Sequence, residues 1–297
     1  MSSPGDRLRA AVGERPIPIP GVFNALTARM AERIGFRAAY LSGGALAAGW
    51  AGLPDIGLVG MTEFADQAAI LAGSTGLPIL CDADTGFGAA VHVERTVRLY
   101  EQAGAAGLHL EDQAMPKRCG HLSGKSVVDA AEMAAKVRAA VAARRDPGFV
   151  IVARTDARSV IGLDDAIDRA RRYVDAGADW IFPEALESLE EFARFARAIP
   201  VPLVANLTEF GRSPLPPFDL LAGLGYRAAL YPLTAFRVAM RAAEEALAEL
   251  HRSGTQQALI PRMQTRAELY DLLGYGDWDA RDRRYFGDEA GGDGRGR

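Results

Sequence analysis

The sequence predicts an α/β fold, a (β/α)8 TIM barrel followed by an additional C-terminal helical segment. One unit recurs along the chain: an amphipathic helix ends in Gly, and a short apolar run and then polar residues follow it. The apolar runs do not alternate with polar residues, which is typical of strands that are covered on both faces in a parallel sheet. Eight such runs with helices between most of them favour closure into a barrel.

The repeating unit supplies most of the predicted strands. A Gly that ends a helix allows the left-handed turn into the next strand. The unit is clearest at 34–44, 103–112, 176–184 and 224–232. Further apolar runs give strands at 78–81, 149–153 and 202–205, and Ile17–Pro20 gives the first strand.

A doubly wound open sheet is the structural alternative. No Gly-x-Gly-x-x-Gly motif follows the first strand, and polar residues end almost every strand instead of gathering at one switch point. The barrel is therefore favoured. We expect residues 1–255 to form the catalytic barrel, 256–286 a C-terminal helical segment, and 287–297 a disordered tail, because its composition is rich in Gly and charge.

Composition excludes several classes of protein. The chain has 297 residues, 49% of them hydrophobic, which is ample for a buried core. Its net charge of −4 does not favour a nucleic-acid partner. No apolar run is long enough to span a membrane, and the first residues lack a signal core. The two cysteines give no disulfide framework, so we expect a cytoplasmic protein.

Polar residues follow the predicted strands at the ends that would converge on one face of a barrel, where active sites lie. They are Ser42, Asp82, Asp84, Glu111, Asp112, Arg154, Asp156, Glu184 and Asn206. Clustered carboxylates repel one another, and a hard divalent cation with oxygen ligands would offset the repulsion. Mg²⁺ fits best, and Asp55 could join its outer shell.

Each of these residues also has a plainer interpretation. Asp or Asn after a strand is often a turn former or a helix N-cap. Two acidic pairs, at 82–84 and 111–112, are harder to explain by capping alone, whereas we expect Asp156 to be structural. Arg154 ends an apolar strand and needs an anionic partner, either a protein carboxylate or a substrate. Arg237 could act likewise or be a surface arginine.

The segment 116–125 is long for a βα loop, rich in Gly and cationic, and it contains Cys119. Long loops above a barrel are usually lids. Flanking Lys117 and Arg118 should favour the thiolate and lower the pKa of Cys119. That cysteine could be a nucleophile, a proton donor, a metal ligand or a bystander. His121 could orient it or simply solvate the loop.

The chain has only three lysines, at positions 117, 125 and 136. A Schiff-base aldolase needs a lysine at a barrel strand end, and none of these is predicted there. An imine mechanism is therefore disfavoured, and a metal-stabilised enolate is favoured instead.

Six segments in order resemble the isocitrate lyase/phosphoenolpyruvate mutase superfamily over roughly residues 16–275. They are 42–44, 52–55, 82–88, 111–113, Lys-Arg-Cys-Gly-His at 117–121, and 153–156. The cysteine motif resembles the lyase branch. Segments 206–211, 231–237 and 263–270 resemble lyases that release pyruvate and succinate from a hydroxylated tricarboxylate.

The resemblance implies a Mg²⁺-dependent carbon–carbon lyase, with Mn²⁺ as a substitute. Asp82 would be the direct ligand, and Asp55, Asp84 and Glu111 would act largely through water. As a mechanistic hypothesis, we expect Cys119 to donate a proton with His121 beside it, and Tyr40 or a metal-shell carboxylate to be the base. The di- or tricarboxylate substrate would be bound by Ser42, Gly43, Gly44, Gly120, Arg154, Glu184, Asn206, Thr208, Arg237 and Arg266.

The family resemblance also implies a homotetramer whose C-terminal helices exchange between neighbouring subunits. Alternatives remain for the activity. A phosphonomutase would use the same barrel and metal on a phosphonate. Dimethylmalate or isocitrate cleavage would differ only by a methyl group or a carboxylate in the pocket. A ligand-binding barrel without activity is the alternative from another class.

Overall fold

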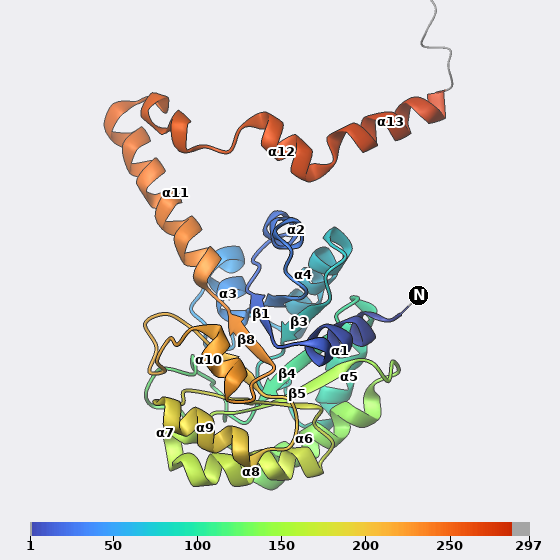
Figure 1. Cartoon of the computed structure of the whole chain (residues 1–297), viewed down its shortest axis with the longest axis vertical. Helices are drawn as coiled ribbons and strands as arrows, with labels where there is room; N and C mark the ends of the chain where they lie inside the picture. Colours follow the sequence, from blue (N-terminus) through green and yellow to red (C-terminus); the bar gives the residue numbers. More distant parts are fainter. Residues whose placement is uncertain (1, 287–297) are drawn as a thin grey trace, which may run out of the picture. The chain divides into compact units, whose positions relative to one another are not determined.

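The computed structural model describes residues 2–286 (Figure 1). Over that range the chain alternates between strands and helices, as the sequence predicts. The strands are β1 (Ile17–Pro20), β2 (Ala39–Leu41), β3 (Ile79–Asp82), β4 (Gly107–Glu111), β5 (Val150–Thr155), β6 (Trp180–Pro183), β7 (Val204–Asn206) and β8 (Ala228–Tyr231).

All strand pairs are parallel. One sheet has the order β1-β8-β7 and the other β2-β3-β4-β5-β6. Isolated parallel bridges join them, from Gly21 to Tyr40 and from Ile181 to Leu203. Each strand is thus paired with its neighbours in chain order, and β8 returns to β1. The carboxyl ends of all these strands consequently point the same way.

Helices follow the strands. Those of the first part of the chain are α1 (Pro4–Glu14), α2 (Ala25–Ile34), α3 (Gly43–Ala51), α4 (Met61–Ser74), α5 (Ala90–Gln102), α6 (Ala130–Ala143), α7 (Arg158–Ile161), α8 (Leu163–Asp175), α9 (Leu189–Ala198), α10 (Phe218–Gly223) and α11 (Thr234–Ser253). Gly35 ends α2 in the left-handed conformation with φ of 101°, which only Gly adopts without strain. The predicted helix-to-strand turn is confirmed there.

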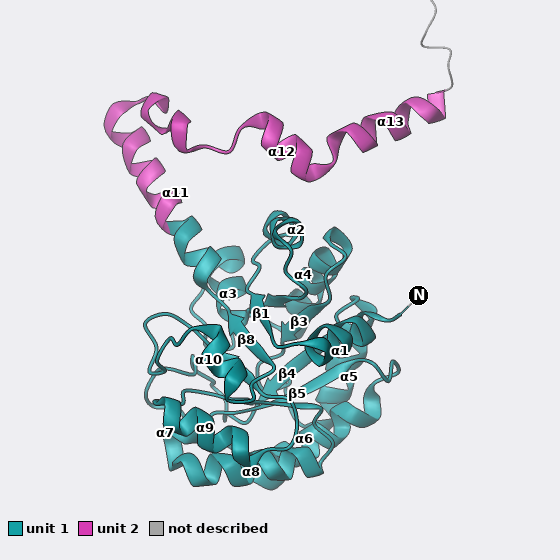
Figure 2. Ribbon diagram, in the orientation of Figure 1, with its two compact units in different colours: residues 1–240 teal, residues 241–297 magenta. Residues whose placement is uncertain are grey.

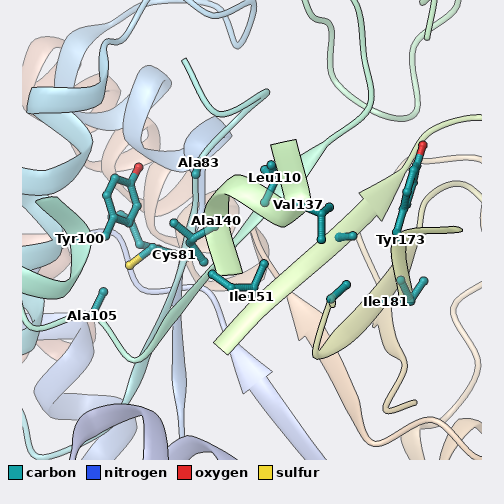
Figure 3. Packing of buried hydrophobic residues seen from close by; sticks show 14 of the residues in the cluster. Cys81, Ala83, Tyr100, Ala105, Leu110, Val137, Ala140, Ile151, Tyr173 and Ile181 are labelled. Carbon is teal, nitrogen blue, oxygen red and sulfur yellow. The ribbon is translucent and has the colours of Figure 1, made fainter. Parts of the chain in front are cut away.

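Successive strand residues belong to two different buried clusters. In β5, Ile151 packs with residues of the surrounding helices, such as Tyr100 and Val137 (Figure 3). Its neighbours Val150 and Val152 point to the other face of the sheet, where they pack with residues of other strands, such as Ile19 and Leu80. Both faces of the strands are therefore buried, which explains why their sequences are continuous apolar runs.

Helix α1 precedes the first strand and was not anticipated from the sequence. Ser3 caps its first turn through a reciprocal pair of hydrogen bonds with Asp6. Leu8 and Val12 are buried in the same cluster as Ile17 of β1. Arg9 donates a 2.8 Å hydrogen bond to the Gly148 carbonyl, just before β5. The helix thus covers the amino ends of strands, opposite to the polar ends.

The chain divides into two compact units within α11, residues 1–240 and 241–297 (Figure 2). Described by itself, the second unit holds the end of α11, a 3₁₀ helix (Gln257–Arg262), α12 (Arg266–Leu273) and α13 (Tyr275–Phe286). The tail predicted at 287–297 lies outside the described residues. Among residues 2–286, no helix has both the length and the apolarity needed to span a bilayer.

Candidate active site

Asp82 ends β3 and is held by backbone amides. Its Oδ2 accepts a 3.0 Å hydrogen bond from the Gly43 N–H, at the start of α3. Its Oδ1 accepts one of 3.0 Å from the Asp84 N–H. Asp84 has a left-handed φ of 46°, so the chain turns sharply after the strand. These contacts fix the orientation of the Asp82 carboxylate at the strand end.

Lys117 brings a positive charge into this acidic group. Its Nζ lies 2.6 Å from Asp84 Oδ1 and also contacts Asp55, and its side chain is only 4% exposed. Burial alone would lower the pKa of Lys117, but Asp84, Glu111 and the other carboxylates outweigh it and raise it. Burial and Asp82 raise the pKa of Asp84 to about 7. The positive charges of the protein therefore do not fully offset the carboxylates of this cluster.

Glu111 ends β4, and one of its oxygens has no partner. Oε1 is buried and accepts no hydrogen bond, while Oε2 lies 3.2 Å from Arg154 Nε. Burial raises the pKa of Glu111 well above its usual range. A buried, unpartnered carboxylate oxygen is costly unless a cation or ordered water reaches it.

The donor set fits a hard cation such as Mg²⁺, which prefers oxygen ligands and retains several waters. Asp82, Asp84 and Glu111 supply carboxylate oxygens at the ends of the neighbouring strands β3 and β4, and Asp55 supplies another from the segment after α3. No three His, Cys, Asp or Glu side chains of the described residues are already grouped closely enough to hold an ion.

Arg154 lies near the carboxyl end of β5 and is surrounded by carboxylates. Its Nε is 2.9 Å from Asp156 Oδ2, and its Nη2 is 3.2 Å from Glu184 Oε2. The guanidinium also lies over the Phe182 ring, 5.1 Å from the centroid. Planar, always charged and buried, it is suited to receive a substrate carboxylate.

Glu184 follows β6 and links Arg154 to the cysteine loop. Its Oε1 lies 2.8 Å from His121 Nε2, and Asn206 donates to both its oxygens at 3.1 and 3.2 Å. The His121 Nδ1 accepts a hydrogen bond from the Arg212 N–H, which leaves the proton on Nε2 for Glu184. The His121 ring therefore binds the loop to Glu184.

Cys119 lines a cavity together with Arg154 and Glu184 and is partly exposed. The expected lowering of its pKa by Lys117 and Arg118 is wrong. Burial raises the pKa of Cys119, although the His121 backbone N–H partly opposes this. The ammonium group of Lys117 forms ion pairs with Asp55 and Asp84 instead. The group present at neutral pH is consequently the thiol.

Tyr40 is a buried residue of β2, and its hydroxyl group points toward Asp82. Its hydroxyl lies 3.3 Å from Asp82 Oδ2 and 2.8 Å from His109 Nε2. Burial and Asp82 raise its pKa well above the ordinary value, so the phenol is protonated. His109 is fully buried, and burial lowers its pKa to about 4.

One cavity at the strand ends gathers most of the residues predicted for the site. Its lining includes Tyr40, Ser42, Gly44, Asp55, Asp82, Glu111, Cys119, Gly120, His121, Arg154, Glu184, Asn206 and Thr208. Gly43 reaches Asp82 through its amide. Arg237 does not line it and lies over the Phe210 ring, near Glu209. Arg266 begins α12 in the second unit, which is described by itself.

Three residues of the site were missed as site residues. Lys117 and Lys125 each make a buried ion pair, and His109 contacts Tyr40. His109 carried a signal, an imidazole within an otherwise apolar strand. The lysines carried none, because a cationic loop has the same sequence whether it is solvated or paired.

The fold and the site together define an α/β class of protein. In this class a cluster of carboxylates, a buried arginine and a cysteine loop lie at the ends of parallel strands. A family model described as phosphoenolpyruvate phosphomutase matches residues 8–251. The chain belongs to the phosphoenolpyruvate mutase/isocitrate lyase superfamily.

Several relatives within this superfamily have named activities. A 2-methylisocitrate lyase of Aeropyrum pernix is 48% identical, with 95% of this chain and 91% of that protein covered. One of Salmonella typhimurium is 50% identical, with 93% and 94% covered. Among solved structures, a 2,3-dimethylmalate lyase matches with a TM-score of 0.90 at 32% identity, covering 97% of each chain. A phosphonopyruvate hydrolase complexed with oxalate and Mg²⁺ matches at 0.87 and 31%, covering 96% and 100%.

Proposed function

We propose that the protein is a Mg²⁺-dependent carbon–carbon lyase that cleaves 2-methylisocitrate into succinate and pyruvate. The observation that carries the proposal is one cavity containing strand-end carboxylates, Arg154 and the Cys119 thiol. The relatives named for this reaction, about half identical over nearly the whole chain, support the choice of substrate.

The proposal includes a closed (β/α)8 barrel as its scaffold. Two parallel sheets joined by bridges at both edges support closure. We assign residues 1–255 to the barrel and 256–286 to a helical segment that is exchanged between subunits of a homotetramer. Large exposed side chains in that segment, such as Trp278 and Tyr285, support burial against another subunit.

Asp82 would hold the magnesium ion directly, with Asp55, Asp84 and Glu111 acting through water; Mn²⁺ is a candidate substitute. When bound, the ion would supply Lewis acidity at the substrate hydroxyl and its adjacent carboxylate. The unpartnered Glu111 Oε1 and the excess of acidic groups support this assignment.

The substrate would be bound by polar groups that line the cavity. Arg154 would pair with a substrate carboxylate, and the amide of Asn206 and hydroxyl of Thr208 would add hydrogen bonds. Ser42, Gly44, Gly120 and Glu184 complete the walls. Gly43, Arg237 and Arg266 remain assigned from family resemblance alone.

Tyr40 is the proposed base for the substrate hydroxyl. Its phenol is protonated, so it could accept that proton only while passing its own toward Asp82 or His109, its two hydrogen-bond partners. Loss of the proton breaks the carbon–carbon bond, the hydroxyl carbon leaves as the ketone of pyruvate, and the electron pair stays on the succinate carbon. Cys119 then gives its proton to that carbon, and His121 holds the loop against Glu184.

A panel of substrates tests the proposal. We expect pyruvate release from 2-methylisocitrate in Mg²⁺, measured with a coupled dehydrogenase, with slower release of glyoxylate from isocitrate and of pyruvate from 2,3-dimethylmalate. Preferential turnover of either analogue would reassign the substrate within the lyase branch. Conversion of phosphonopyruvate without lyase activity would instead place the protein among the phosphonate-processing enzymes.

A further inference from the structure

Lys125, near the end of the cysteine loop, has a buried ammonium group. Its side chain is 1% exposed, and Nζ lies 2.7 Å from Asp156 Oδ1. The same nitrogen donates to the Gly120 carbonyl. Removing a charge from water is expensive unless it is paired and hydrogen-bonded, so the loop can place Lys125 here only because Asp156 neutralises it.

The Lys125 bond to Gly120 fixes the turn that follows Cys119. Gly120 is packed directly on the arginine, since a Cβ added to it would lie 2.4 Å from Arg154 Nη2 and 2.5 Å from Glu184 Cγ. No side chain fits in that space. The backbone next to Cys119 is thus held between Lys125 and Arg154.

Asp156 is shared between the loop and the arginine. Besides Lys125, it binds Arg154 with both oxygens, at 2.9 Å to Nε and 3.1 Å to Nη2. Its own position does not depend on the loop, because its N–H donates a 2.8 Å hydrogen bond to Asp112 Oδ1. Asp112 is fully buried and also accepts from Thr155.

We propose that Lys125 is a positioning residue that closes the cysteine loop over Arg154, and that Asp156 couples this closure to the binding of an anion at Arg154. One carboxylate partly neutralises two cations. A carboxylate ligand bound to Arg154 neutralises part of the charge of this arginine. Asp156 then interacts more strongly with Lys125. The proposal rests on the proposed function, in which Arg154 binds substrate and Cys119 reacts in the closed loop.

Alkylation of Cys119 measures loop opening without turnover. The chain has two cysteines, and the other, Cys81, is fully buried in the core. Iodoacetamide labelling, quantified by peptide mass spectrometry, therefore gives separate rates for the two thiols. Rates are compared at their high-pH plateau, so that a change in thiol pKa is not mistaken for a change in access.

In the Lys125→Met variant we expect labelling of Cys119 to be about tenfold faster, because the open state is more populated. The control is Lys136→Met, which removes another buried lysine, one bonded to the Thr85 carbonyl and not to the loop. It should leave the Cys119 rate unchanged. If Lys125→Met fails to fold, Lys125→Gln removes the same charge with a smaller structural change. An unchanged rate in a folded Lys125 variant would overturn the proposal.

Coupling is tested by adding succinate with Mg²⁺ as a non-reacting dicarboxylate. A bound ligand shields the thiol directly in both proteins, whereas protection through Asp156 needs Lys125. We expect succinate to slow labelling several-fold more in the wild type than in Lys125→Met. Equal protection factors would refute the coupling. Normal turnover with a fast-labelling loop would instead count against Cys119 as proton donor, and so against the proposed function.

Discussion

At the scale of single residues, the buried guanidinium of the site is already paired with carboxylates of the protein. Arg154 contacts Glu111, Asp156 and Glu184. If Arg154 binds substrate as proposed, the substrate carboxylate would join an existing network and compete with these groups for the guanidinium. Sequence reasoning found Arg154 and most of its acidic neighbours, because charged residues at the ends of apolar strands are conspicuous. It could not determine which charges pair, since that depends on contacts between distant segments.

The role of Cys119 gives a prediction at this scale. Replacing it with Ala removes the proposed proton donor, and loss of an acid–base group lowers turnover by about 10²–10⁴. Steady-state pyruvate release measures the effect. Cys81→Ala is the matched control and should turn over normally, since this thiol is buried in the cluster that the strands form with the surrounding helices. Full activity in Cys119→Ala would eliminate the proton-donor role.

His109 makes acid stability predictable. Burial lowers its pKa from 6.5 to about 4. Between these values the unfolded chain binds a proton that the folded protein does not, so the free energy of unfolding falls as pH falls, by up to ~1.4 kcal/mol per pH unit. The contribution is complete above pH 6.5 and lost by about pH 4. Urea unfolding in chelator should show this slope reduced in His109→Gln; identical slopes would contradict it.

At the scale of elements, the strands and their polar ends were predictable and helix α1 was not. Strand prediction succeeded because residues such as Ile151 and Val152 face different cores and are both apolar. Helix α1 precedes the repeating unit, so no repeat indicated it. Likewise, the loop carrying Lys117 and Lys125 reads as a solvated lid, although both ammonium groups are buried on strand-end carboxylates.

The packing of α1 against the strands can be tested by Leu8→Ala. Leu8 is fully buried, and such truncations lower the free energy of unfolding by about 2–5 kcal/mol. Denaturant unfolding measures the loss. Val91→Ala on α5 is the control, since Val91 is 67% exposed and should change stability by less than ~0.5 kcal/mol. Equal, small effects of both changes would mean that α1 contributes little to the core.

At the scale of the whole molecule, the second unit is the part that a single chain leaves least buried. Its helices expose Tyr275, Trp278 and Phe286, as expected for a segment that packs on another subunit. We expect light scattering after gel filtration to give about four times the chain mass of 31.7 kDa. Truncation after residue 255 should reduce the number of chains in each particle. A full-length monomer would contradict the exchanged segment.

In the proposed reaction, the strand-end carboxylates would hold a magnesium ion that supplies Lewis acidity for carbon–carbon cleavage, and the cysteine loop would protonate the new carbanion. Mass spectrometry of the products formed from 2-methylisocitrate in D₂O tests it most directly. We predict equal amounts of pyruvate and succinate, with a single carbon-bound deuterium in each succinate, and no products in chelator or with Asp82→Asn. Products that form equally well without Mg²⁺, or succinate without deuterium, would contradict the account.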